Sequence, residues 1–433
     1  MSNTTRVAVV AGARTPFVKM GTHFKHHRAL DLATHSVDGL IESAALDPDV
    51  VDEMVYGIVT LEPRLPQFAR EVNFNSKLPS DVRSYTIVDN CITGITAISN
   101  VTDSIRSGRA RVGIAGGVDS MSNPAVMFSK NAADMFSDLT FAKTAADKLK
   151  ALARLRPSDV KPRAPGVTEP STGLSMGEHT EITVKQWGIS RTEQDEIAFR
   201  SHMRAAAATE NGTLTAEIHP LGGIDRDTIT RPSTSMEKLA KLPPVFDRSE
   251  AGTLTAGNSS PLTDGASAIL LMSEQAAADL GYTPLAFVRS VEFAAIDPDD
   301  GLLMAPGVAV PRLLRRTGLE LGDLDLIDIH EAFAGQVASN IAAWERGWKE
   351  PPPSPSERST RTSSTSTAGP SPSGIPSRRQ GHGLSRRPPM SWPAGTEDLG
   401  SSACAERAQR RPRCSWNAPD FLRRLATPSQ RNR

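Results

Sequence analysis

Strand-like and helix-like patterns alternate along this chain, and the alternation restricts its fold class. Short runs of β-branched and apolar residues at 7–10, 53–59, 84–88 and 112–115 alternate with amphipathic stretches at 29–44 and 92–107. This pattern predicts an α/β protein with mostly parallel sheets covered by helices. A second half is expected from about Gly252. Its strand-like runs are residues 269–272, 286–293 and 326–329.

Cys91 lies where one strand-like run changes into a helix-like one. Residues 85–88 favour a strand, and the apolar residues Ile95 and Ile98 that follow have helical spacing. We therefore expect Cys91 at the positive end of a helix. The thiol pKa there is expected to lie below its usual value of about 8.5, which favours the thiolate. Backbone N–H groups there can also bind an oxyanion. A single cysteine is more often a small buried apolar residue, so a catalytic role depends on the rest of the chain.

Four other segments carry chemistry-bearing residues in a fixed order. Residues 14–17 are Arg-Thr-Pro-Phe, residues 113–122 end a buried strand in a glycine turn, residues 252–268 form a polar loop, and residues 325–336 deliver His330. Together with Cys91 these segments resemble the thiolases. The run His-Glu-Ala-Phe from His330 is most similar to the thiolase subunit of the fatty-acid oxidation multienzyme complex, since short-chain thiolases have Asn-Glu-Ala-Phe. The resemblance covers residues 6 to about 349.

The resemblance implies a fold and a domain organisation. The thiolase fold has two similar α/β halves in five layers (αβαβα) with an inserted loop domain. It implies an N-terminal domain at 1–250, which includes a loop domain at about 125–245, and an incomplete C-terminal domain at 251–349. The fold would place Cys91 and His330 at the C-terminal edges of strands, where α/β sites collect.

The resemblance also implies an activity, that of an acetyl-CoA C-acyltransferase (3-ketoacyl-CoA thiolase) of fatty-acid β-oxidation. Such an enzyme cleaves 3-ketoacyl-CoA with CoA, giving acetyl-CoA and a shortened acyl-CoA. Coenzyme A would be a co-substrate, with no permanently bound cofactor and no metal. The expected partners are a second copy of the chain, as a dimer or tetramer, and a hydratase/dehydrogenase subunit.

Individual site residues follow from the matched motifs. Cys91 would carry the acyl group, and His330 would hold an oxygen at the first oxyanion site, directly or through water, unless it only caps a strand end. Ser260 matches the family serine near the pantetheine arm, although turn chemistry alone could explain it. Met176 and His179 lie where the loop domain lines the acyl tunnel. Arg14 is expected to be structural.

Composition favours a cytoplasmic protein. The chain has 433 residues, 38% of them hydrophobic, and three cysteines, which suits a reducing compartment. It has no apolar run of about 18 residues and no leader-like start before residue 7. A basic amphipathic stretch at 145–156 could contact a membrane surface, a partner subunit or, as we favour, the chain's own dimer mate.

The net charge of zero is the sum of two parts of opposite charge. Residues 351–433 hold 14 arginines, no lysine and five acidic residues, so the tail carries +9 and the rest of the chain −9. Pro, Ser, Arg and Thr dominate the tail without apolar periodicity, which predicts an irregular or disordered segment. Such a basic tail can indicate a nucleic-acid partner, but we expect none, because its coding sequence offers another explanation.

When the coding sequence of the tail is read in a shifted frame, it can encode motifs of this family. Residues 364–377 can be encoded so that a frame starting one base earlier gives Leu-Asn-Val-Asn-Gly-Gly-Ser-Ile-Ala-Ile-Gly-His-Pro-Phe. This matches the family segment that holds the Gly-His-Pro histidine. The same shift over residues 404–418 permits Cys-Gly-Ala-Gly, which resembles the motif of the family's second catalytic cysteine. We infer a frameshift near residue 350, so that Cys404 and Cys414 are not the family's second cysteine and the chain has lost both motifs.

Two other functions remain open from the sequence. A ketosynthase-type condensing enzyme shares the fold and the nucleophilic cysteine but uses two histidines. An inactive, truncated thiolase remnant would bind CoA weakly or misfold. Turnover of a 3-ketoacyl-CoA with free CoA separates both from an active thiolase.

Overall fold

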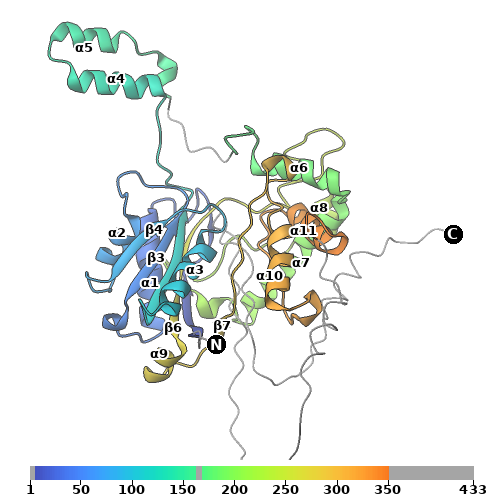
Figure 1. Ribbon diagram of the computed structural model, residues 1–433. Helices are drawn as coiled ribbons and strands as arrows, with labels where there is room; N and C mark the ends of the chain where they lie inside the picture. Colours follow the sequence, from blue (N-terminus) through green and yellow to red (C-terminus); the bar gives the residue numbers. More distant parts are fainter. Residues whose placement is uncertain (1–4, 162–167, 351–433) are drawn as a thin grey trace, which may run out of the picture.

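The computed structural model describes residues 5–161 and 168–350 (Figure 1). The irregular tail predicted after about residue 350, with Cys404 and Cys414, lies outside the described residues. None of the helices in the described ranges is long and apolar enough to cross a membrane.

A seven-stranded mixed sheet forms the core of the first half. Its strand order is β4-β3-β5-β6-β1-β7, with β2 paired to β6. β3 is parallel to β4 and β5, whereas β6 is antiparallel to β5 and β1. The strands are β1 (Val7–Arg14), β2 (Val18–Lys19), β3 (Glu53–Ile58), β4 (Arg83–Ile87), β5 (Val112–Ser120), β6 (Thr263–Ser273) and β7 (Ala286–Val288).

Helices cover both faces of this sheet because the buried strands are apolar on both sides. Alternate residues of β3 show this: Met54 and Tyr56 belong to the core cluster under α1 (Ala29–Ser43) and α2 (Phe68–Asn75), whereas Val55 belongs to the cluster under α3 (Thr93–Arg106). Successive strand side chains point to opposite faces. The predicted layering of helices on both faces of a sheet is therefore present. The prediction of mostly parallel strands is wrong, because β6 is antiparallel to β5, β1 and β2, and β7 is antiparallel to β1.

A second, helical core lies beside the sheet (Figure 1). Apolar residues of α6 (Met176–Trp187), α7 (Arg191–Glu210) and α11 (Ala334–Arg346) form one buried cluster with Leu254 and Phe333. Capping boxes at Ser175 and Ser190 begin α6 and α7. The other helices of the described chain are α4 (Lys130–Phe141), α5 (Ala145–Leu152), α8 (Met236–Ala240), α9 (Glu274–Asp279) and α10 (Pro306–Thr317).

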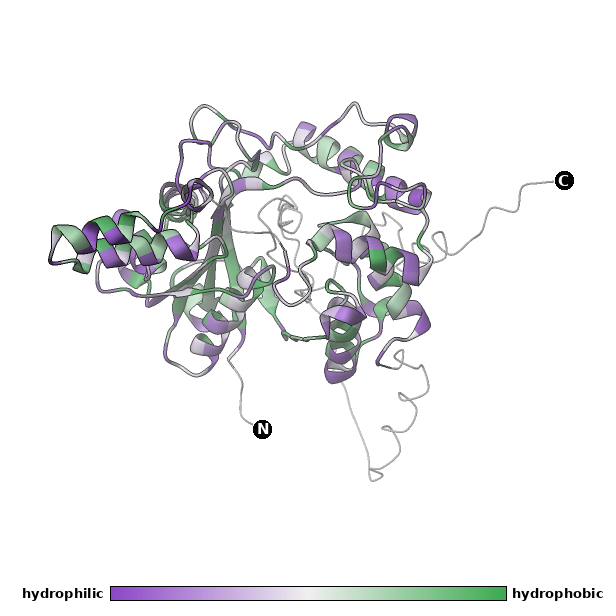
Figure 2. Ribbon diagram, turned by 90° about the horizontal axis from the view of Figure 1, so that it is seen from above, coloured by the Kyte–Doolittle hydropathy of each residue, from purple (hydrophilic) through white to green (hydrophobic). Residues whose placement is uncertain are grey.

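Helices α4 and α5 form a hairpin that projects away from both cores (Figures 1 and 2). Two apolar side chains of this hairpin are strongly exposed, Phe141 at 79% and Leu149 at 71%. Phe136 and Leu152 are exposed as well. These four side chains therefore line no channel within this chain.

Of the strands predicted for the second half, the one at 269–272 is present but belongs to the first sheet, and the prediction of a strand at 326–329 is wrong. The strand expected at 269–272 belongs to β6, which lies between β5 and β1 and so completes the first sheet. Residues 326–329 form no strand, and residues 325–329 make no backbone–backbone hydrogen bond to another described residue. An extended run becomes a strand only when a neighbouring strand pairs with it, and the described chain supplies no neighbour here. The strand expected at 286–293 ends at Val288 in β7.

Candidate active site

Cys91 lies in the turn between β4 and α3, two residues before the first residue of the helix. It is partly exposed and is the only cysteine of the described ranges. The residue before it, Asn90, has a left-handed backbone with φ of 43°, a conformation that asparagine tolerates better than most residues. The amide of Ile92 donates to the Asp89 carbonyl and that of Thr93 to the Asn90 carbonyl, which closes the turn. The predicted position of Cys91 at a helix N-terminus is confirmed.

Polar contacts join two of the sequence motifs where β5 ends and β6 begins. The backbone N–H of Ser122, in the glycine-turn motif, donates to Asp264 Oδ1 at 2.8 Å, and its hydroxyl donates to Asp264 Oδ2 at 2.5 Å. Asp264 belongs to the polar loop motif and is fully buried. Burial raises the pKa of its carboxyl, against the hydrogen bonds from Ser122. This carboxylate fixes where β5 ends relative to β6.

Arg14 has a structural role, as expected. Its buried guanidinium donates to both carboxylate oxygens of Asp227, at 2.7 and 2.9 Å, and to Glu217 at 2.8 Å. Asp227 also accepts from the backbone N–H of Phe17. These bonds tie the end of β1 to the segment after α7 and leave Arg14 engaged by protein groups.

His330 and Ser260 are brought into neighbouring segments. The N–H of Ser260 donates to the Ala332 carbonyl at 2.9 Å, and the N–H of Ala334 donates to the Asn258 carbonyl at 2.9 Å. Burial lowers the pKa of His330 to about 4, so its imidazole is neutral near pH 7. A neutral imidazole offers one N–H donor and one acceptor nitrogen. Burial also raises the pKa of the adjacent Glu331 carboxyl, against the influence of Ser201, Arg204 and Arg200.

Helix α6 anchors the loop that carries Ser260. The buried carboxylate of Glu181 accepts from the backbone N–H groups of Thr253 and Leu254, each at 2.9 Å, and from the Thr253 hydroxyl at 3.1 Å. His179 on the same helix is buried, and its Nε2 lies 2.7 Å from the Thr172 hydroxyl. Met176 is the first residue of α6 and packs against the helical core.

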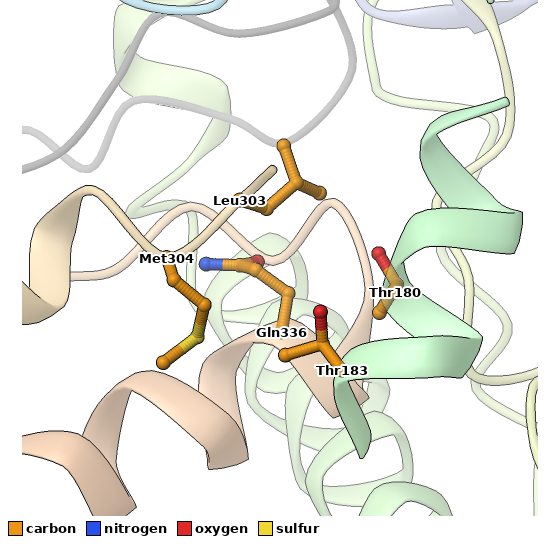
Figure 3. Close-up of a pocket in the computed structure, with 5 residues that line it drawn as sticks. All are labelled: Thr180, Thr183, Leu303, Met304 and Gln336. Carbon is orange, nitrogen blue, oxygen red and sulfur yellow. The ribbon is translucent and has the colours of Figure 1, made fainter. Parts of the chain in front are cut away.

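A small hollow lies between α6, α11 and the segment before α10 (Figure 3). Thr180, Thr183, Leu303, Met304 and Gln336 line it. Gln336 is only 7% exposed, and its Oε1 atom has no hydrogen-bond partner among the described residues. We did not predict this hollow from the sequence, although Gln336 closes the motif that carries His330. Met176 and His179 precede Thr180 and Thr183 on α6 but do not line the hollow.

The candidate residues fall into two groups. Cys91 belongs to the sheet of the first half, whereas Ser260, Met176, His179 and His330 belong to the helical core and the loops around it. In the described ranges, no cluster of three or more His, Cys, Asp or Glu side chains is placed to hold a metal ion.

Comparison with known proteins assigns both halves to one family. The family profile "Thiolase, N-terminal domain" matches residues 7–275, and "Thiolase, C-terminal domain" matches residues 282–349. The 3-ketoacyl-CoA thiolase of Shewanella denitrificans is 44% identical over 342 residues, and that of Colwellia psychrerythraea is 43% identical over the same length. Each alignment covers 78% of this chain and 78% of the relative.

Solved structures give the same assignment. A crystal structure of the Bacillus anthracis acetyl-CoA acetyltransferase superimposes with a TM-score of 0.69 at 29% identity. Human mitochondrial 3-ketoacyl-CoA thiolase in complex with CoA superimposes with a TM-score of 0.66, also at 29% identity. Both comparisons cover 78% of this chain and 82% of the solved chain. The fold class expected from the sequence is confirmed.

Proposed function

This chain belongs to the thiolase family of acyltransferases, which use CoA as a substrate, and on that premise we propose that it transfers acyl groups through a thioester on Cys91. The reaction is cleavage of a 3-ketoacyl-CoA by CoA in fatty-acid β-oxidation. The observation that carries the proposal is the position of Cys91, partly exposed and two residues before the start of α3. A helix N-terminus favours the thiolate that such chemistry needs.

The bond changes balance in two half-reactions. The Cys91 thiolate attacks the C3 keto carbon, the C2–C3 bond breaks, and its electron pair goes to the thioester enolate. Protonation of that enolate at C2 releases acetyl-CoA. The thiol of a second CoA then loses its proton, attacks the acyl carbon and expels the Cys91 thiolate.

His330 is proposed to hold an oxygen at the first oxyanion site. Because its pKa is lowered to about 4, its ring donates a hydrogen bond as a neutral imidazole and does not act as a cation near pH 7. Fixed donors aimed at a developing negative charge stabilise the transition state. Ser260 is proposed to contact the pantetheine arm of CoA, because its loop is paired with the segment that follows His330. Met176 and His179 are proposed to contact the acyl chain.

The chain as written is proposed to be an impaired thiolase. Two observations support the loss of the segment that follows residue 350: the C-terminal family profile ends at residue 349, and residues 325–329 make no backbone–backbone hydrogen bond to another described residue. The lost segment would have held the base that activates Cys91 and the second cysteine that moves the proton. Proposed partners are a second copy of the chain and a hydratase/dehydrogenase subunit, which would supply the 3-ketoacyl-CoA.

Trapping of the acyl-enzyme tests the role of Cys91. The restored-frame chain is the protein made from a gene in which the codons after about residue 350 are read in the shifted frame that encodes the family motifs. It is mixed with acetoacetyl-CoA without free CoA, and its peptides are analysed by mass spectrometry. We expect an acetyl group on the Cys91 peptide and none in Cys91→Ser. Acetylation at another peptide, or normal release of acetyl-CoA by Cys91→Ser, would refute the assignment.

Thiol labelling of the chain as written is an independent test. Iodoacetamide at neutral pH should label Cys91 faster than Cys404 or Cys414. The double variant Cys404→Ser/Cys414→Ser is the matched control, since it must keep the fast label. An inert Cys91 in the folded protein would contradict the proposal.

A further inference from the structure

Thr93, the first residue of α3, makes two kinds of contact around the Cys91 turn. Its hydroxyl donates to the Asn90 carbonyl at 2.6 Å and accepts from the backbone N–H of Asp89 at 2.9 Å. One side chain thus holds the two residues that precede Cys91. Because a hydroxyl has one donor hydrogen and two acceptor lone pairs, both bonds can form together.

The methyl group of Thr93 packs against a glycine of the sheet. A Cβ atom built on Gly57 of β3 would lie 2.0 Å from Thr93 Cγ2, far closer than two carbon atoms can approach. Gly57 is the register partner of Ile87, the last residue of β4. Thr93 is 1% exposed. The absent side chain at Gly57 therefore lets the first turn of α3 lie directly on the sheet beside the end of β4.

A second glycine, two helical turns farther along, provides an internal comparison. A Cβ atom on Gly113 of β5 would lie 2.6 Å from Val101 Cγ1. Val101 belongs to α3, eight residues after Thr93, and its apolar side chain offers no hydrogen bond to the Cys91 turn. Gly57 and Gly113 thus set how closely the two parts of α3 approach the sheet, and only Gly57 lies under the turn.

We propose that Thr93, seated on Gly57, is a positioning residue that fixes the Cys91 sulfur at the N-terminus of α3. The hydroxyl holds the left-handed turn at Asn90, and the methyl sets the height of that turn above the sheet. Loss of the hydroxyl bonds lets the turn relax, and a side chain added at Gly57 pushes Thr93 off the sheet; in either case Cys91 leaves the backbone N–H groups. This inference rests on the proposed role of Cys91.

Alkylation of Cys91 across a pH range tests it in the chain as written. Thr93→Val keeps the methyl group and loses the hydroxyl, so we expect labelling by iodoacetamide to slow about tenfold at neutral pH, because small displacements of a reactive group have large rate effects. The pH of half-maximal labelling should move upward. Thr93→Ser keeps the hydroxyl and should restore most of the rate. Gly57→Ala should behave like Thr93→Val.

Gly113→Ala is the matched control. It should lower the melting temperature about as much as Gly57→Ala, yet leave the labelling rate and its pH profile unchanged, which separates positioning from general destabilisation. Equal labelling of the wild type and Thr93→Val, or equal slowing by Gly113→Ala, would overturn the inference. A wild-type Cys91 that does not label at all would instead contradict the proposed nucleophile.

Discussion

At the scale of single residues, the groups of the candidate site differ in solvent exposure, protonation and hydrogen bonding. Cys91 keeps access to solvent, and its turn depends on a left-handed asparagine. His330 is enclosed enough that it stays neutral in the folded protein. Glu181 is buried as well, but three donors surround its carboxylate. A buried polar group is tolerated only when its protonation or its hydrogen bonds compensate for lost water.

The His330 environment predicts a pH-dependent stability. Its pKa falls from about 6.5 in the unfolded chain to about 4 in the folded protein. Below pH 6.5 the unfolded state therefore binds the proton first, so this contribution is complete above pH 6.5 and is lost as the pH falls toward 4. His330→Gln should remove of order 2–3 kcal/mol of the difference in unfolding free energy between pH 7 and pH 4.

Urea unfolding at several pH values measures this dependence. His26→Gln is the control for the loss of a histidine, because His26 is exposed. A wild-type profile that runs parallel to that of His330→Gln would show that folding does not shift the pKa of His330, which would contradict the prediction.

At the scale of elements, α6 organises the candidate substrate side of the site. Its N-terminus carries Met176, its first turns carry His179, and Glu181 holds the loop that leads to Ser260. Phe246 and Phe333 stack edge-to-face with ring centroids 5.7 Å apart, and Gly177 leaves room for Phe246. The helix, the loop and the segment after His330 therefore form one packed unit.

Removal of the Glu181 carboxylate should loosen this unit. Glu181→Ala leaves the buried N–H of Leu254 and the partly buried N–H of Thr253 without acceptors, and a buried unsatisfied group costs about 1–3 kcal/mol. Glu181→Gln keeps one acceptor oxygen and should cost less. Urea denaturation measures both variants. Glu196→Ala on exposed α7 surface is the control, and an equal loss there would contradict this role of Glu181.

The α4–α5 hairpin should not determine which acyl chains are accepted. Replacement of Phe136, Phe141, Leu149 and Leu152 by serine in the restored-frame enzyme should leave the ratio of kcat/KM for 3-ketohexadecanoyl-CoA and acetoacetyl-CoA unchanged, since all four are exposed. Met176→Ala should shift this ratio, because each buried methylene of the substrate contributes about 0.8 kcal/mol. A ratio that changes with the serine variant alone would place the acyl chain at the hairpin.

At the scale of the whole molecule, the two halves of the described chain differ in secondary structure. The first half has a sheet of seven strands with helices on both faces. The second half, within the described residues that follow Val288, has helices and isolated bridges but no strand. An extended run without a partner leaves backbone groups to water or to another chain.

Restoration of the reading frame should therefore change both activity and stability. We expect the chain as written to turn over acetoacetyl-CoA and CoA at least about a thousandfold more slowly than the restored-frame chain, because catalytic groups that act as a unit fail together. The restored chain should also melt at a higher temperature and be more soluble. Steady-state kinetics and calorimetry of the two chains provide the comparison. Comparable turnover by both would refute the impairment.

The sequence by itself determined the features that depend on local pattern. Strand-like and helix-like runs located β1, β3, β4, β5, α1 and α3, although β1 and β5 extend beyond the expected runs. The position of Cys91 followed from a strand-like run directly before a helix-like one. The ordered motifs were enough to identify the family. These features depend on residues that are close in the chain, so local preference and tertiary packing agree.

Only the tertiary structure decided which strand belongs to which sheet and which side chains meet. β6 pairs with strands more than a hundred residues earlier. Residues 326–329 pair with no strand of the described chain, although their pattern favours a strand. The contact of Thr93 with Gly57 and the hold of Glu181 on the Ser260 loop also join residues distant in sequence. Strand pairing and close approach depend on partners elsewhere in the chain, and the pattern of one segment carries no information about whether those partners are present.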